Sequence, residues 1–236
     1  MAKSRGLEAE TSGARDRIID ALLGLAGESA WHTITISDIA GRAGISLAEF
    51  RTHFPSKGAI LGAFSKRIDT IVLQETTGDL DAESARERLF DILMRRIDAL
   101  APHKDSIRSI IAGLRHDPLN LLAMNQVASN SMRFMLEAAG IETEGPLGSI
   151  KVQGAVLSFA YIVDVWLRDD DAGLSRTMAA LDRELGKGAM MARRLDDFGR
   201  MSVPLATMMD MAMERGRSMW DSRIRNRHDP DLDPGT

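Results

Sequence analysis

The side chains best suited to bind another molecule lie close together, between residues 42 and 57. Arg51 and Lys57 can meet phosphate oxygens, whereas Thr52 and His53 can hydrogen-bond to phosphates or to base edges. These residue types in one short stretch predict contact with a nucleic acid. The candidate contact residues are Arg42, Ser46, Leu47, Ala48, Arg51, Thr52, His53 and Lys57.

Local start and stop signals predict the elements that would position these side chains. Thr35 and Asp38 form the pattern of a capping box, in which each side chain bonds the backbone amide of the other residue, so a short helix starts here. Gly44 ends that helix because glycine readily adopts the left-handed conformation of a turn. Ser46 and Glu49 repeat the capping pattern and start a second helix. The order of these signals predicts a helix-turn-helix.

Glu49 can be interpreted in two ways. As the partner of Ser46 in a capping box, its carboxylate would be used locally. On a helix facing DNA, a carboxylate is repelled unless it accepts a hydrogen bond from a cytosine amino group. We expect the capping role.

Three short motifs resemble the N-terminal DNA-binding domain of the TetR/AcrR family of transcriptional regulators: Asp38-Ile39-Ala40, Ala43-Gly44-Ile45-Ser46 and Phe54-Pro55-Ser56-Lys57. The resemblance covers roughly residues 14–72. It implies an all-α fold, a double-stranded DNA operator as partner, and a phosphate contact for Lys57 at the start of the fourth helix. The chain departs from the family pattern at Leu47, Glu49 and Arg51, where that family more often has a lysine or small polar residue, a threonine and a tyrosine.

The resemblance also implies a domain plan and a repressor released from DNA by a small, apolar ligand. We expect a flexible arm over residues 1–13, a DNA-binding domain over 14–75, a helical effector-binding and dimerisation domain over 82–225, and a disordered tail over 226–236. Apolar spacing predicts helices within the second domain at 84–100, 104–114, 119–139, 149–167, 174–185 and about 203–224.

Residues 149–167 are apolar nearly all round, so this helix needs cover on more than one side. In the TetR family the last two core helices pair across a two-fold axis, and the matching segments here are 149–167 and 174–185. A partner subunit would supply the cover. The expected residues of the homodimer interface are Gly154, Ala155, Ala160 and Leu181.

Methionine suggests where a ligand would bind. Met94, Met124, Met132 and Met135 lie on helices that would surround the centre of a TetR-like second domain, and methionine adapts to irregular apolar ligands. Asp164, inside an apolar helix, could anchor a polar group of the ligand. The alternatives are that the methionines fill the core and that a neighbouring arginine satisfies Asp164.

The composition predicts a cytoplasmic protein without disulfide bonds. The 236 residues are 44% hydrophobic, include no cysteine and carry a net charge of −4. The N-terminus lacks the apolar segment of a secretion signal. Residues 1–75 contain nine Lys and Arg and nine Asp and Glu, so DNA binding would depend on a local basic patch.

No pattern of a common catalytic site is present. The chain has no P-loop, no Gly-x-Ser-x-Gly and no His-Glu-x-x-His, and its five histidines lack the spacing of metal ligands. We therefore expect no enzymatic activity, no cofactor and no metal ion.

A second resemblance leaves an alternative function open. Residues 166–185, with acidic residues followed by a threonine, look like the C-terminal segment of TetR-fold lipid-binding accessory proteins of ubiquinone biosynthesis, which do not regulate transcription. A later segment, residues 208–227, combines Met208, Met209, Met213 and Trp220 with several arginines. It could lie on a membrane surface or pack on the core. We favour the DNA-binding interpretation because the capping signals and the Gly turn are intact.

Overall fold

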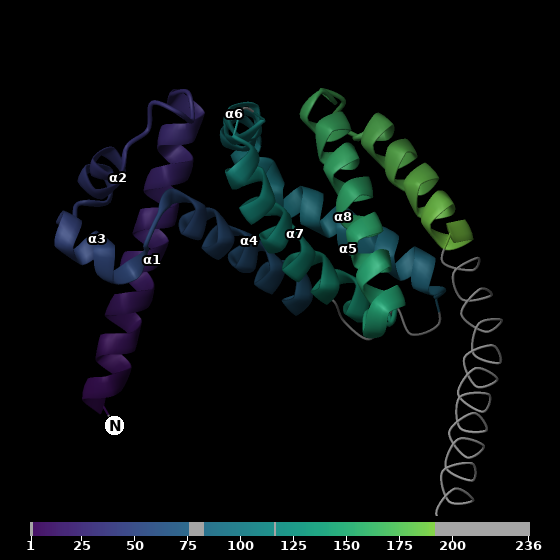
Figure 1. The fold of residues 1–236 in the computed structure, drawn as a ribbon, viewed down its shortest axis with the longest axis horizontal. Helices are drawn as coiled ribbons and strands as arrows, with labels where there is room; N and C mark the ends of the chain where they lie inside the picture. The colour runs from purple at the N-terminus through teal and green to yellow at the C-terminus, as the bar shows by residue number, and fades with distance from the viewer. Residues whose placement is uncertain (1, 76–82, 116, 192–236) are drawn as a thin grey trace, which may run out of the picture. The chain divides into compact units, whose positions relative to one another are not determined.

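The computed structural model of the chain describes residues 2–75, 83–115 and 117–191, with side chains from residue 13 onward. All regular structure in these ranges is helical (Figure 1). This agrees with the all-α fold class expected from the sequence.

The N-terminal helices are α1 (Ala2–Glu28), α2 (Ile36–Ala43), α3 (Leu47–His53) and α4 (Lys57–Gln74). They are followed by α5 (Ala85–Leu100), the short 3₁₀ helix η2 (Ala101–His103), α6 (Lys104–Leu114), α7 (Pro118–Ala138) and α8 (Gly145–Leu167). A further helical segment covers residues 175–191.

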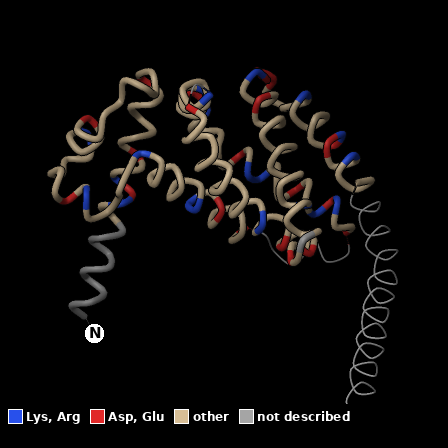
Figure 2. The backbone as a smooth tube through the Cα atoms, viewed as in Figure 1, with Lys and Arg blue, Asp and Glu red and all other residues tan. Residues whose placement is uncertain are grey.

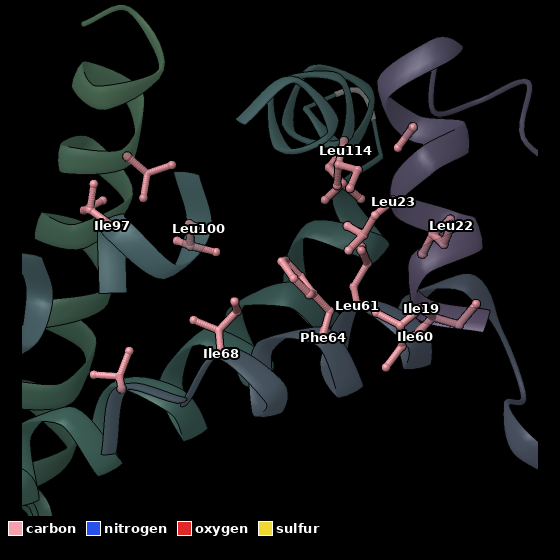
Figure 3. Packing of buried hydrophobic residues seen from close by; sticks show 14 of the residues in the cluster. Ile19, Leu22, Leu23, Ile60, Leu61, Phe64, Ile68, Ile97, Leu100 and Leu114 are labelled. Carbon is pink, nitrogen blue, oxygen red and sulfur yellow. The ribbon is translucent and has the colours of Figure 1, made fainter. Parts of the chain in front are cut away.

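A continuous hydrophobic core joins the N-terminal helices to the later ones. α1 packs on both α4 and α6, and α4 packs in turn on α5 and α7. Figure 3 shows buried side chains of α1, α4, α5 and α6 that belong to this core. The labelled residues are Ile19, Leu22, Leu23, Ile60, Leu61, Phe64, Ile68, Ile97, Leu100 and Leu114.

The division of the chain into a DNA-binding domain and an effector-binding domain stays a prediction. Residues 1–188 form one compact unit that includes helices on both sides of the expected boundary between residues 75 and 82. The reason is that α4 is long enough to pack on α1 with its first turns and on α7 with its later ones.

Several expected element boundaries also shift. Residues 2–13 of the expected flexible arm are helical and belong to α1, and residues 7–10 are strong helix formers. α8 begins at Gly145, four residues before the expected start. The helix expected to end at Leu185 continues through two glycines to residue 191. The expected helix over about 203–224 and the tail over 226–236 lie outside the described residues.

Candidate nucleic-acid interface

The start of α2 has the geometry that the sequence predicts. The Thr35 hydroxyl accepts a hydrogen bond from the Asp38 amide at 3.1 Å, and an Asp38 oxygen accepts one from the Thr35 amide at 2.8 Å. Both bonds of the capping box are therefore made, and the bond from the Thr35 side chain holds the pKa of Asp38 below its ordinary value.

Gly44 forms the turn between α2 and α3. Its φ of +68° lies in the left-handed region, and its amide bonds back to carbonyls of the last turn of α2. Phe50 and Phe54 then hold α3 from inside, since both side chains are almost fully buried. The guanidinium of Arg15 lies 4.3 Å from the centre of the Phe54 ring and donates to the His53 carbonyl at 2.8 Å. α1 thus fixes the C-terminal end of α3.

The outward side of α3 is exposed, as expected for a surface that contacts DNA. Leu47 is 54% exposed, and Ala48, Arg51 and Thr52 are also exposed. The Thr52 hydroxyl donates to the Glu49 carbonyl at 2.7 Å. The guanidinium of Arg51 has no hydrogen-bond or ion-pair partner among the described residues, so it remains available for a phosphate.

The second capping box is incomplete, which corrects the interpretation of Glu49. The Ser46 hydroxyl accepts from the Glu49 amide at 3.1 Å, but within the described part of the chain the Glu49 carboxylate has no partner. At the start of α5 the same sequence pattern is closed, because Glu87 accepts from the Ser84 amide at 2.9 Å. Glu49 is therefore an exposed, uncommitted carboxylate on the outward side of α3.

Lys57 has an internal role that sequence reasoning missed. Its ammonium group donates to the carbonyls of Trp31 at 3.1 Å and Ile34 at 2.7 Å, and lies 4.5 Å from the centre of the Trp31 ring. Burial lowers the pKa of Lys57. Lys57 thus ties the start of α4 to the loop before α2, and the phosphate contact expected for it stays a prediction. The signal that could have found this clamp is the nearby buried tryptophan.

Arg42 is also engaged within the protein. It forms a bidentate ion pair with Glu28 at the end of α1, with N–O distances of 3.0 and 2.6 Å. The hydrogen bond to Glu28 raises the pKa of Arg42. Figure 2 shows acidic and basic positions interleaved along α2 and α3. Of the two arginines proposed for DNA contact, Arg51 is the one without an internal partner in the described part of the chain.

The methionines expected to line a ligand pocket lie in or against the hydrophobic core, and their role in ligand binding stays a prediction. Met132 and Met135 are buried in the hydrophobic core, and Met94 and Met124 are partly buried against it. The expected anchor, Asp164, is instead paired with Arg115 at 2.9 Å and with Arg168, whose hydrogen bond is the main reason that the pKa of Asp164 is lowered. Plain core packing and an arginine pair, the alternatives considered above, account for these residues. No three His, Asp or Glu side chains in the described ranges are placed to hold a metal ion.

The expected dimer residues divide into two groups. Gly154 and Ala160 are exposed and Ala155 is partly exposed, whereas Leu181 is fully buried in the core of its own chain. Leu181 is therefore a wrong choice, because the helix of residues 175–191 turns that side toward the core. The exposed apolar residues of α8 are instead Ile150, Leu157 and Tyr161, which follow one another with Gly154 along one side of the helix.

α8 is unusually apolar for its exposure. By length and composition, residues Leu147–Leu167 could cross a membrane, and 28% of an 18-residue window in this stretch is buried within the chain. Among its exposed apolar side chains, Leu157 has an exposed fraction of 65%. An apolar helix with this much free surface needs further cover.

The segment that resembles ubiquinone accessory proteins has a local structural explanation. An Asp169 oxygen accepts from the Thr177 amide at 2.9 Å and from its hydroxyl at 2.8 Å. Asp171 accepts from Gly173 and Ser175. The acidic residues and the threonine thus close the loop between α8 and the next helix. The methionine- and arginine-containing segment at 208–227 lies outside the described residues.

Comparisons with known proteins find that the chain is similar to helix-turn-helix transcriptional regulators. It is 29% identical to BetI, an HTH-type transcriptional regulator of Klebsiella pneumoniae, over 70% of this chain and 87% of BetI. It is also 29% identical to YvdT, an uncharacterised HTH-type transcriptional regulator of Bacillus subtilis, over 46% of this chain and only 56% of YvdT. The crystal structure of a TetR transcriptional regulator from Nitrosomonas europaea superimposes with a TM-score of 0.60 and 25% identity, covering 75% of this chain and 98% of that one. No protein-family model matches the chain.

Proposed function

We propose that this chain, a TetR-type DNA-binding transcriptional regulator by its fold and its homologues, is a repressor that reads its operator through α3 and leaves it when a small ligand binds. It acts by binding and not by catalysis, in the cytoplasm. The ubiquinone accessory function receives no support from these relatives, which are regulators of transcription.

The exposed side of α3 is the observation that supports this proposal. Caps at both helix starts, the turn at Gly44 and the buried Phe50 hold α3 in one position, while Arg51, Glu49 and Leu47 remain free of internal contacts that would block a groove. A rigid helix with an unused face fits the major groove of B-DNA.

One such helix gives too little affinity, so we propose that two copies bind together. The exposed residues Ile150, Leu157 and Tyr161 of α8 form an apolar stripe, with Gly154 between them allowing close approach of a second helix. A second copy of α8 is the occupant that best suits this stripe, because an isologous contact pairs it with itself. The two α3 helices of the dimer would then read two half-sites of one operator.

The experiment is a selection from random double-stranded DNA with the full-length protein, followed by anisotropy titrations of the selected site at several salt concentrations. We expect a two-fold symmetric site and an affinity that falls steeply with salt. Arg51→Ala should weaken binding, whereas Arg86→Ala, which removes an exposed cation on α5, should not. Failure to enrich any sequence would overturn the proposal.

A further inference from the structure

A cavity of about 550 Å³ lies between α4 and α7. These two helices pack on each other within the compact unit of residues 1–188 (Figure 1). The walls come from residues 62–73 of α4 and residues 127–134 of α7. Its volume is in the range of sites for small ligands, roughly 300–1,000 Å³.

The floor of this cavity is a buried polar network contributed by three helices. Asp69 of α4 pairs with Arg96 of α5, and the same Asp69 oxygen accepts from the Ser131 hydroxyl of α7 at 2.7 Å. Asp69, Arg96 and Ser131 are each less than a tenth exposed. The Arg96 Nε is buried without a partner in the described part of the chain. Such a network costs free energy in a core that apolar residues could fill, so its presence beside a cavity points to a ligand.

Two cations at the walls have no carboxylate partner among the described residues. Lys66 is exposed, and its ammonium group has no hydrogen-bond or ion-pair partner among the described residues. The Arg133 guanidinium donates only to the Thr143 carbonyl, at 3.1 Å. Because Asp69 is neutralised by Arg96, the cavity is positive. It therefore favours an anion.

The remaining wall is apolar. Leu73, Val127 and Phe134 line the cavity, and Phe134 is 59% exposed although it is a large aromatic side chain. An exposed phenylalanine beside a cavity is suited to cover an apolar ligand surface.

We propose that the α4/α7 cavity binds an organic acid with an apolar body. Its acid group meets Lys66 and Arg133, and its apolar part lies against Phe134, Val127 and Leu73. As the effector site of a repressor, the cavity rests on the proposed function, but ligand binding itself does not.

The position of the cavity also explains how a bound ligand would affect the DNA-binding helices α2 and α3. α4 forms one wall, and its first turn is tied to the loop before α2 through Lys57. Phe64 and Ile60 of the same helix pack in the core shared with α1. A ligand that binds only the conformation with one particular distance between α4 and α7 would favour one position of α2 and α3.

A pair of fluorescent probes tests the proposal with the full-length protein. 8-Anilino-1-naphthalenesulfonate carries an apolar body and an acid group, and N-phenyl-1-naphthylamine has the same rings without the acid. We expect the anionic probe to bind at least about tenfold more tightly, because only its acid group can make charge-assisted contacts with Lys66 and Arg133. Equal affinities for the two probes would overturn the assignment of an anionic ligand.

Substitutions locate the binding site. Lys66→Met and Arg133→Met should each weaken the anionic probe about tenfold and leave the neutral probe unchanged, whereas Arg183→Met, which removes an exposed cation on the helix of residues 175–191, should affect neither probe. Val127→Phe should fill the cavity and weaken both probes, with melting temperatures showing that each variant is folded. Unchanged binding of the anionic probe in all three cavity variants would place the site elsewhere and overturn the proposal.

DNA selection and probe binding together distinguish a failure of this inference from a failure of the proposed function. If the probe binds as expected but the protein selects no DNA, the repressor proposal fails and the cavity stands. If an operator is found and the cavity variants do not alter probe binding, the cavity proposal fails and the repressor stands.

Discussion

Single residues in the segment 35–57 divide into those that hold it together and those left free to contact DNA. Lys57 and Arg42 satisfy internal groups, the former at two carbonyls and the latter at Glu28. Arg51 and Glu49 have no partner in the described part of the chain and lie on the exposed side of α3. Substitutions in the two groups should therefore have different physical consequences.

Glu49 is expected to select a base. A carboxylate accepts a hydrogen bond from the cytosine amino group, whereas an amide prefers adenine. We expect wild-type selections to show cytosine at one position of each half-site, and Glu49→Gln to shift that position toward adenine with discrimination of about 1–3 kcal/mol. Identical selected sequences for the two proteins would show that Glu49 contacts no base.

We expect a substitution at Lys57 to lower the stability of the fold and one at Arg51 to weaken DNA binding alone. Lys57→Met removes two hydrogen bonds from a charged group and should destabilise the protein by roughly 1–3 kcal/mol, measured as the free energy of unfolding in urea. Arg51→Met should leave that free energy within about 0.5 kcal/mol and lower the salt slope of DNA binding by about 1. A destabilised Arg51→Met variant would contradict the free state assigned to this side chain.

At the scale of elements, the loop before α2 is locked between α4 and α6. Trp31 is buried, and a Cβ added at Gly113 of α6 would lie 2.5 Å from the Trp31 Cβ. Ser106 and Ser109 of α6 donate to carbonyls of Leu23 and Ser29 at 2.7 and 3.0 Å. α6 therefore fixes the end of α1 as well as the loop.

The close approach at Gly113 predicts an unusual response to alanine. Gly113→Ala should destabilise by about 1–3 kcal/mol because the methyl group must displace the Trp31 side chain. Gly41→Ala in α2 is the matched control, since nothing lies within 4 Å of its added Cβ. That variant should instead stabilise by about 0.5–1 kcal/mol. Urea unfolding of both variants compares them, and equal effects would contradict the packing at Trp31.

His103, at the join of η2 and α6, should make stability depend on pH. Burial lowers its pKa, aided by the charge of Arg67, and its ring packs edge-on against Phe64. Because the folded-state pKa lies below the unfolded-state value, the stability from neutral His103 is present above pH of about 6.5 and lost as the pH falls through the folded-state pKa.

Replacing His103 with a side chain that does not titrate tests this dependence. His103→Gln should reduce the loss of melting temperature between pH 7.5 and pH 5.5, whereas replacing the exposed His32 by Gln should leave the loss unchanged. If the melting temperature of His103→Gln falls as much as that of the wild type, groups other than His103 cause the pH dependence.

At the scale of the whole molecule, the proposed dimer would be held by the stripe Ile150, Leu157 and Tyr161 of α8. We expect a homodimer, and Leu157→Arg should convert it to a folded monomer because the side chain is exposed in the single chain and buried only by a partner. Light scattering at micromolar concentration measures the mass.

Leu119→Arg is the control for this prediction. Leu119 is 81% exposed and belongs to α7, a different helix from the stripe, so its replacement should leave the dimer intact. Monomeric wild-type protein, or dimers that survive Leu157→Arg, would place the contact between copies elsewhere. Operator affinity should fall together with the dimer, since both half-sites are needed.

The sequence by itself determined the elements whose signals act within a few residues. Thr35 with Asp38, Ser84 with Glu87 and Gly44 mark helix ends through bonds that span three or four residues, so the helix-turn-helix and the α5 start could be read directly. The apolar spacing likewise gave α5, α6 and α7 to within one residue at each end.

Only the tertiary structure decided which side of each helix is covered and which charges are paired. Asp69 meets Arg96 across 27 positions, and Asp164 meets Arg115 across 49. A capping pattern in the sequence also does not guarantee its second hydrogen bond. The exposed Glu49 carboxylate gains about as much free energy from hydrogen bonds to water as from one to the Ser46 amide. Contacts between residues distant in the chain therefore created the α4/α7 cavity and buried Leu181.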